Sequence, residues 1–219
     1  MDKMKTAALF DLDGVVLDTE SQYSKFWGAQ GRTYRPDIPH FDQVIKGQTL
    51  TQIFSRYFSD YPAAVLEKIT AGLDDFEQHM EYNYIPGARE MLAWLQESGI
   101  PAALVTSSND RKMQAVRRAR PELEGYFSAW VTADKVTHSK PHPECFLLGA
   151  QLLGRGPGEC VVFEDSFHGL AAGRAAGMTV VGLATTKSRA ELEGRADLLI
   201  DDFARLSPAA LWVEIGGLS

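Results

Sequence analysis

Four short and continuously apolar runs constrain the fold of this chain more than any other feature of its sequence. They are rich in Val, Leu and Ala and span Thr6 to Phe10, Ala102 to Thr106, Cys160 to Glu164 and Thr179 to Leu183. Continuous apolarity is typical of strands in a parallel sheet that is covered on both faces. Two weaker runs, Ala129 to Ala133 and Asp197 to Ile200, are candidates for further strands.

Helical patterns lie between these runs from Pro86 to the end of the chain. Met91 and Leu95 share one helix face, and Phe146 and Ala150 share another. Strands that alternate with helices in this way predict an α/β fold with a Rossmann-like, doubly wound parallel sheet.

The segment from residue 17 to residue 85 departs from this alternation, because it has helical patterns and no convincing buried strand. The residues at helical spacing are Tyr23, Phe26 and Trp27, then Leu50, Ile53, Phe54 and Tyr57, then Ile69, Leu73, Phe76 and Met80. Thr19 and Gln22 predict a capping box before the first of these helices. We therefore expect a small α-helical cap domain over residues 17–85, inserted into an α/β core domain of residues 1–16 and 86–219.

The composition limits the classes of partner. The chain has 219 residues, of which 45% are hydrophobic, and a formal net charge of −7. Such a chain can bury a sizeable core, whereas nucleic acid and anionic membranes favour basic proteins. We therefore expect neither nucleic acid nor a membrane as a partner, and the sequence identifies no protein partner. The basic cluster from Arg111 to Arg120 has helical spacing and is interpreted as a solvated helix face.

Targeting signals and cysteine content indicate the cellular compartment of a protein. The N-terminal sequence has no apolar run of signal-peptide length, and no segment reaches the roughly 18 apolar residues of a membrane span. Cys145 and Cys160 have no metal-type spacing and are interpreted as packed thiols of a reducing compartment. These features predict a cytoplasmic protein.

Polar side chains follow the predicted strands, at the edge where an open parallel sheet collects its functional groups. These residues are Asp11, Asp13, Thr106, Ser107, Ser108, Asn109, Lys140, Glu164 and Asp165. We expect two acid pairs, a hydroxyl cluster and one lysine to face a single crevice.

Asp11 and Asp13 are two residues apart, so an extended chain places both carboxylates on the same side. With Asp165 nearby, their repulsion requires a cation, because two like charges about 4 Å apart cost roughly 4 kcal/mol at an effective dielectric of 20. An all-oxygen cluster suits Mg²⁺, whereas zinc prefers His or Cys. The nearby histidines His138, His142 and His168 have no paired ligand spacing and are interpreted as ordinary loop or contact residues.

Together these groups fit phosphoryl transfer. A carboxylate can attack phosphorus and form an aspartyl-phosphate. Asp13 would then protonate the leaving alcohol and later accept a proton from water. Magnesium neutralises phosphate oxygens, Thr106 donates a hydrogen bond to them, and Lys140 supplies a fixed positive charge.

Four motifs carry a resemblance to a known family. The strings FDLDGVVLDTE, LVTSSND, SKPHPECF and VVFEDSFHGL resemble, in this order, the four signatures of the haloacid dehalogenase superfamily of aspartate-dependent phosphatases and mutases. Together they span the predicted sheet domain. The insertion after the first string resembles the helical cap of the subgroup that contains β-phosphoglucomutase.

The resemblance implies catalytic and metal-binding roles for the acids. Asp11 would be the nucleophile and a metal ligand. Asp13 would be the acid/base, and its backbone carbonyl would also contact the metal. Asp165 would bind Mg²⁺ directly, and Glu164 would bind it directly or through water.

The resemblance also implies a phosphate site. Thr106 and Lys140 would contact the phosphate of the substrate. Ser107 and Asn109 would add phosphate or substrate contacts.

These motifs leave two activities open, because a fold does not choose between hydrolysis and phosphoryl shuttling. In a β-phosphoglucomutase the cap supplies a histidine and an arginine that hold a second phosphate, and Tyr23 and Leu50 stand at the corresponding positions here. We therefore expect a Mg²⁺-dependent hydrolase of phosphoric monoesters, acting on small phosphorylated metabolites and on sugar phosphates first, rather than a phosphosugar mutase. A phosphoaspartate signalling module is disfavoured, because such domains are shorter and have no cap.

Overall fold

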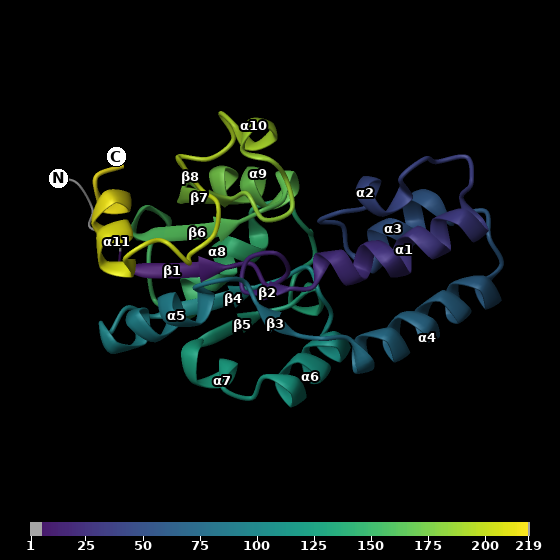
Figure 1. Cartoon of the computed structure of the whole chain (residues 1–219), viewed down its shortest axis with the longest axis horizontal. Coiled ribbons are helices and arrows are strands. Elements are labelled where there is room, and N and C mark those ends of the chain that lie inside the picture. The colour runs from purple at the N-terminus through teal and green to yellow at the C-terminus, as the bar shows by residue number, and fades with distance from the viewer. Residues whose placement is uncertain (1–5, 219) are drawn as a thin grey trace.

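The central element of the molecule is a sheet of six parallel strands. The computed structural model describes residues 6–218, and the strand order is β5-β4-β1-β6-β7-β8. The strands span Ala129–Val131 (β5), Ala102–Val105 (β4), Ala7–Phe10 (β1), Cys160–Glu164 (β6), Thr179–Leu183 (β7) and Leu198–Ile200 (β8). Their parallel pairing confirms the predicted α/β fold (Figure 1).

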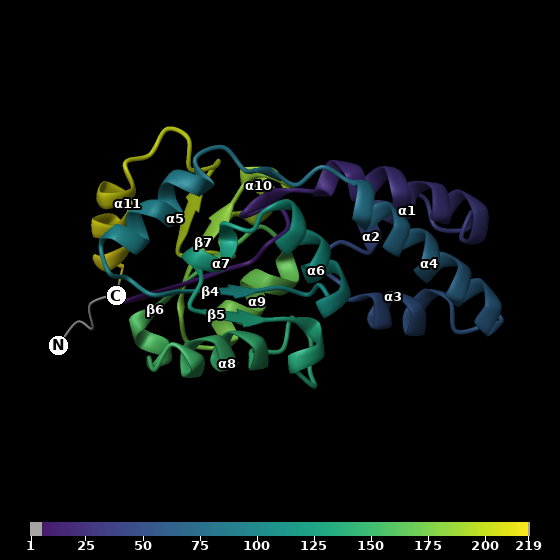
Figure 2. The same ribbon diagram turned by 90° about the horizontal axis from the view of Figure 1, so that it is seen from below.

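Helices cover both faces of this sheet, as Figures 1 and 2 show. One face packs against α5 (Ala88–Glu97), α6 (Asp110–Ala119), α7 (Leu123–Tyr126) and α11 (Pro208–Gly216), and the other against α8 (Glu144–Leu152), α9 (Phe167–Ala175) and α10 (Arg189–Leu192). Two 3-10 turns, η1 (Ala133–Lys135) and η2 (Pro157–Glu159), lie in the connections. In β1, Phe10 packs in the first face and Leu9 in the second, because successive side chains of a strand point in opposite directions. Burial on both faces explains why the predicted strands are apolar throughout.

All six predicted strands are present, but four of them are shorter than the apolar runs. Thr6, Thr106, Thr132 and Asp197 lie outside the strands. Thr106 and Thr132 are nevertheless buried, with 3% and 2% of their surface exposed. The apolar runs overestimate strand length because burial continues into the turn after the hydrogen-bonded ladder ends.

A separate group of helices lies beyond the carboxyl ends of the strands (Figure 1). It consists of α1 (Glu20–Tyr34), α2 (Phe41–Val44), α3 (Leu50–Tyr57) and α4 (Ala63–His79), which we call the helical insert. These helices surround their own apolar cluster, in which the rings of Phe26 and Phe76 stack at 5.2 Å between centroids. The helices predicted for this segment are confirmed. The division into domains at residues 1–16, 17–85 and 86–219 stays a prediction, and residues 1–5 of it lie outside the described part of the chain.

Two short strands join the helical insert to the sheet, in a segment where we expected no convincing buried strand. β2 (Leu17–Asp18) and β3 (Asn83–Tyr84) pair antiparallel, with Leu17 opposite Tyr84. A strand of two residues is too short to show a period of two in its sequence. No sequence pattern therefore reveals this pair.

The predicted capping box at Thr19 and Gln22 is wrong. The buried Thr19 hydroxyl donates to the Asp13 carboxylate rather than accepting an N–H group of α1, and Gln22 bonds to the backbone after α4. A complete capping box begins α3 instead. There Thr49 Oγ1 accepts from the backbone N–H of Gln52 at 3.2 Å, and the Gln52 side chain accepts from the backbone N–H of Thr49 at 2.8 Å.

Two further expectations concern cysteines and membrane spans. Cys145 and Cys160 are both buried, as expected of packed thiols. No helix between residues 6 and 218 has both the length and the apolarity that crossing a bilayer requires.

Candidate active site

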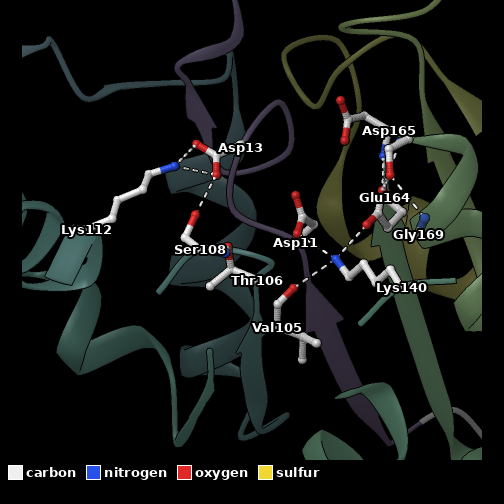
Figure 3. A network of polar contacts seen from close by, with 11 residues as sticks. Asp11, Asp13, Val105, Thr106, Ser108, Lys112, Lys140, Glu164, Asp165 and Gly169 are labelled. Carbon is white, nitrogen blue, oxygen red and sulfur yellow. Dashed lines mark hydrogen bonds and ion pairs between the residues drawn. The ribbon is translucent and has the colours of Figure 1, made fainter. Parts of the chain in front are cut away.

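Side chains from two strand ends and one loop meet at the carboxyl edge of the sheet. Asp11 follows β1, Glu164 ends β6, Asp165 follows it, and Lys140 comes from the loop before α8. They line a cavity of about 550 Å³ whose opposite wall is the helical insert. Figure 3 shows the Lys140 ammonium between Asp11 and Glu164. The sequence-predicted residues therefore line one crevice, with the exception of Thr106, which is buried and does not line it.

The ammonium of Lys140 binds two of the carboxylates in this group. Its ammonium donates to Asp11 Oδ1 and Glu164 Oε1, both at 2.7 Å, and to the carbonyl of Val105 at 3.1 Å, although only 3% of the residue is exposed. Burial alone would lower the pKa of Lys140, but the two carboxylates raise it above its usual range. Lys140 therefore carries a fixed positive charge.

Asp11, Glu164 and Asp165 form a buried acidic cluster, with one oxygen from each within 4.8 Å of the others. Burial raises the pKa of Asp11 to about 7, with Lys140 opposing and Glu164 adding to this shift. Burial also raises the pKa of Asp165 well above its usual range, and the charge of Glu164 adds to the effect. The single ammonium of Lys140 does not balance three carboxylates, so the cluster fits a further cation. An all-oxygen donor set of this kind suits Mg²⁺.

The three acids differ in how many of their oxygens are already occupied. Glu164 Oε1 accepts from Lys140, and Oε2 accepts from the N–H of Asp165 at 2.9 Å and from the N–H and hydroxyl of Ser166 at 2.8 and 3.0 Å. Asp165 Oδ2 accepts from the Thr186 hydroxyl. Asp11 and Asp165 therefore have more free acceptor positions than Glu164.

The side chain of Asp13 lies outside this cluster. Lys112 donates to both of its carboxylate oxygens at 2.7 and 2.6 Å, Ser108 donates at 3.2 Å, and the Thr19 hydroxyl is a third donor. In Figure 3, Asp13 faces Lys112 and Ser108 while Asp11 faces Lys140. The two aspartates of the first motif thus occupy different electrostatic surroundings.

Lys112 is a residue of the site whose contact with Asp13 the sequence analysis missed. The interpretation of the basic cluster as a solvated face is wrong for this lysine, because only 4% of it is exposed. Its ammonium also lies 4.5 Å from the centre of the Tyr23 ring in the helical insert. One signal was present in the sequence: Lys112 is three and four residues before Ala115 and Val116, which are buried on the same helix face.

The loop after β4 contributes hydroxyl and amide groups. Ser107, Ser108 and Asn109 line the cavity. Thr106 is buried beside them, and its hydroxyl oxygen accepts from the N–H of Ser108 at 3.0 Å. The Asn109 side chain accepts from the N–H of Lys112 at 2.9 Å and thereby caps the N-terminus of α6. This cap is a structural contact that the sequence analysis did not anticipate.

Histidines lie near the site without joining the acidic cluster. His138 and His142 are exposed beside Glu144, whose carboxylate accepts from the backbone N–H groups of Thr137 and His138 at 2.8 and 2.9 Å. These contacts hold the loop that carries Lys140, in agreement with the interpretation of these histidines as loop residues.

Comparisons with known proteins place this geometry in a family. A model of haloacid dehalogenase-like hydrolases matches residues 5–177. Hexitol phosphatase A of Escherichia coli (strain K12) is 33% identical over 179 residues, which cover 80% of this chain and 81% of that protein. The fructose-1-phosphate phosphatase YqaB of the same organism is 34% identical over 184 residues, which cover 79% of this chain and 93% of that protein.

A solved structure agrees with the fold. β-Phosphoglucomutase of Clostridium difficile superimposes with a TM-score of 0.79 at 23% identity, covering 97% of each chain. At this identity the likeness supports the architecture of sheet and helical insert, and it does not decide between phosphatase and mutase.

The family match spans the elements that carry all four motifs, from β1 to α9. It therefore confirms the resemblance seen in the motifs and the prediction of a hydrolase. The activities named for the curated relatives agree with the predicted action on phosphoric monoesters. The chain belongs to the haloacid dehalogenase-like hydrolases.

Proposed function

We propose that this hydrolase is a Mg²⁺-dependent phosphatase that works through an aspartyl-phosphate on Asp11. The observation that carries the proposal is the buried contact of Lys140 with both Asp11 and Glu164 at 2.7 Å, beside Asp165 in the wall of the cavity. This arrangement holds a carboxylate nucleophile next to a fixed positive charge, as phosphoryl transfer requires.

The proposed cycle has two steps. In the first, an Asp11 oxygen attacks phosphorus, the bond from phosphorus to the substrate oxygen breaks, and Asp13 protonates the leaving alcohol. For this step Asp13 must first take up a proton from solvent and give up its ion pair with Lys112. In the second, water attacks the same phosphorus, Asp13 takes a proton from it, and the bond to Asp11 breaks to release phosphate. Lys140 would stabilise the charge on the phosphoryl oxygens throughout.

The loop after β4 and the acidic cluster would supply the remaining contacts. Thr106, Ser107 and Asn109 would donate to the phosphate or to the substrate. Mg²⁺, when bound, would neutralise phosphate oxygens. Asp165, together with Asp11 and the backbone carbonyl of Asp13, would hold it directly.

Glu164 would contact the metal through water rather than directly. Both of its oxygens already accept hydrogen bonds from Lys140 and from the Asp165 to Ser166 turn. Its second function would be to keep the Lys140 ammonium in place.

The substrate would be a small phosphorylated metabolite, with sugar phosphates first. A cavity of about 550 Å³ has room for such a molecule, and the named relatives act on hexitol and fructose phosphates. The mutase is the second candidate because of the shared fold. It is disfavoured because Tyr23 and Leu50 line the cavity where a phosphosugar mutase supplies cationic contacts.

Residues 17–85 would act as a cap that excludes water and selects the substrate. A cytoplasmic location and the absence of nucleic acid and membrane partners stay predictions.

The proposal is tested by replacing Asp11 with Asn and measuring phosphate release from a panel of hexose and hexitol phosphates with Mg²⁺. We expect Asp11→Asn to lose at least a thousandfold in kcat, because the amide is not a nucleophile. Asp18→Asn is the matched control, since Asp18 belongs to the same motif, is exposed and does not line the cavity. Persistent turnover in Asp11→Asn, or full wild-type activity in EDTA, would contradict the proposal.

A further inference from the structure

The wall that the helical insert contributes to the cavity combines apolar and aromatic side chains with polar ones, and one of its acids is buried. Its apolar and aromatic members are Tyr23, Trp27, Val44, Ile45, Leu50, Ile53 and Leu73. The acid is Glu77 of α4, of which only 7% is exposed although it lines the cavity.

Glu77 has unused capacity to accept hydrogen bonds. Its Oε1 accepts from the Tyr23 hydroxyl at 2.8 Å, and within residues 6–218 no donor reaches Oε2. An ionised carboxylate has about four acceptor positions, and burying a charged group with so few partners is costly. A buried carboxylate that keeps a free oxygen beside a cavity is therefore placed to receive a donor from a ligand.

Glu77 also lies on the side of the cavity where the leaving alcohol belongs. It bonds to Tyr23, the Tyr23 ring covers the ammonium of Lys112, and Lys112 bonds to Asp13. In the proposed cycle Asp13 protonates the leaving oxygen, so the rest of the alcohol extends from Asp13 toward the helical insert. Glu77 lines the cavity on this side.

Charge at this wall disfavours a second anionic group. Lys46 is the cation that the helical insert places in the wall, and its ammonium lies 3.2 Å from Glu20. Lys112 is bound to both oxygens of Asp13. Both ammonium groups are thus paired in this structure, and Glu77 adds a negative charge to the wall of the helical insert. The remaining lysine of the lining besides Lys140, Lys187, comes from the opposite side of the cavity, where its ammonium lies 5.4 Å from the centre of the Phe167 ring.

We propose that Glu77 is a specificity-determining residue that accepts hydroxyl hydrogens of the leaving alcohol, so that the enzyme selects phosphate monoesters with a hydroxylated, uncharged remainder and rejects esters with a second phosphate. This inference rests on the proposed phosphatase function and goes beyond it by naming the chemistry of the leaving group. It assigns no part in bond breaking to Glu77.

The test compares two substrates in Glu77→Gln, which preserves the shape of the side chain and removes its charge. The substrates are a hexitol phosphate and the hydroxyl-free hexyl phosphate, each with Mg²⁺. For the hexitol phosphate we expect kcat/KM to fall about tenfold or more, since hydrogen bonds to charged groups are the stronger ones. For hexyl phosphate we expect little change. The relative rate with a hexitol bisphosphate should rise.

Asp74→Asn is the matched control. Asp74 lies on the same helix, one turn earlier, with the same 7% exposure, but it pairs with Arg111 at 2.6 Å and does not line the cavity. We expect this variant to keep the wild-type ratio of the two substrates. Melting temperatures establish that each variant is folded. If Glu77→Gln does not fold, Glu77→Asp withdraws the carboxylate while keeping its charge and should lower the same ratio.

Two results separate the inference from the function on which it rests. An active wild type whose substrate ratio is unchanged by Glu77→Gln and Glu77→Asp would overturn the role of Glu77 alone. A wild type that releases phosphate from neither ester would overturn the proposed function and the inference together.

Discussion

The position of the Glu164 carboxylate depends on the absence of a side chain at Gly169. Its carboxylate joins the Lys140 ammonium to the turn after β6, and Gly169 of α9 lies beside it (Figure 3). A Cβ atom at Gly169 of α9 would lie 1.7 Å from Glu164 Oε1 and 1.8 Å from Cδ. Only a glycine allows the helix to approach the acid this closely. The position of the Lys140 charge therefore depends on Gly169.

Replacing Gly169 with Ala should accordingly displace Glu164 from Lys140. We expect a loss of stability of about 1–3 kcal/mol from overpacking and a loss of kcat of about a hundredfold, because small displacements in an active site are costly. Chemical denaturation and phosphate release measure the two effects. Gly28→Ala is the control, since Gly28 lies inside α1 with its nearest contact, Arg32 Nη1, at 3.5 Å. That change should stabilise the protein by about 0.5–1 kcal/mol. Equal behaviour of the two variants would refute the argument.

Helix α6 contacts both Asp13 of the active site and the helical insert. Its first turn carries Lys112, which binds Asp13, and Arg111, which pairs with the buried Asp74 of α4 at 2.6 Å. The turn is held by Asn109, whose side chain accepts from the N–H of Lys112. The start of this helix therefore sets both the surroundings of Asp13 and a contact with the helical insert.

Asn109 combines this capping contact with a proposed contact to the substrate, and two substitutions separate the two roles. Asn109→Ala should cost about 1 kcal/mol of stability through loss of the cap and should raise KM severalfold. Asn109→Ser retains a capping oxygen, so we expect it to restore the stability but not the KM. Denaturation midpoints and steady-state kinetics measure the outcome. A wild-type KM in Asn109→Ser would show that Asn109 serves the helix alone.

For the molecule as a whole, the sequence predicts those features that extend over several residues, namely the apolar strands and the four motifs. Apolar runs located the six strands because parallel strands are buried on both faces, and the four motifs located the acids and Lys140 because each follows a strand. Thr19 was misassigned because its partner Asp13 is set by the tertiary fold. Lys112 was misassigned because the buried face of a helix is recognised by its apolar residues, and a lysine on that face does not fit this pattern. The pair β2 and β3 is too short to form any pattern.

The buried acids also make the stability of the whole molecule depend on pH. Burial raises the pKa of Asp11 to about 7 and raises that of Asp165, whereas both are ordinary in the unfolded chain. Between about pH 4 and pH 7 the metal-free folded state therefore binds more protons than the unfolded state. Its free energy of unfolding falls as pH rises through this range. Acids with lowered pKa values, such as the half-buried Glu144 and the exposed Glu191, act in the opposite direction, at more acidic pH.

Magnesium should reverse this trend, because it binds ionised carboxylates and so competes with their protons. We expect the rise in melting temperature on adding Mg²⁺ to be small near pH 5 and to grow toward pH 8, since ligand binding to the folded state stabilises it more as affinity increases. Scanning calorimetry with Mg²⁺ and with EDTA across this range measures both trends. Asp11→Asn provides the control: it removes one titrating acid from the cluster, so its metal-free stability should fall less steeply with pH than that of the wild type. A stabilisation by Mg²⁺ that is equal at pH 5 and pH 8 would show that the metal does not bind to the cluster of Asp11, Glu164 and Asp165.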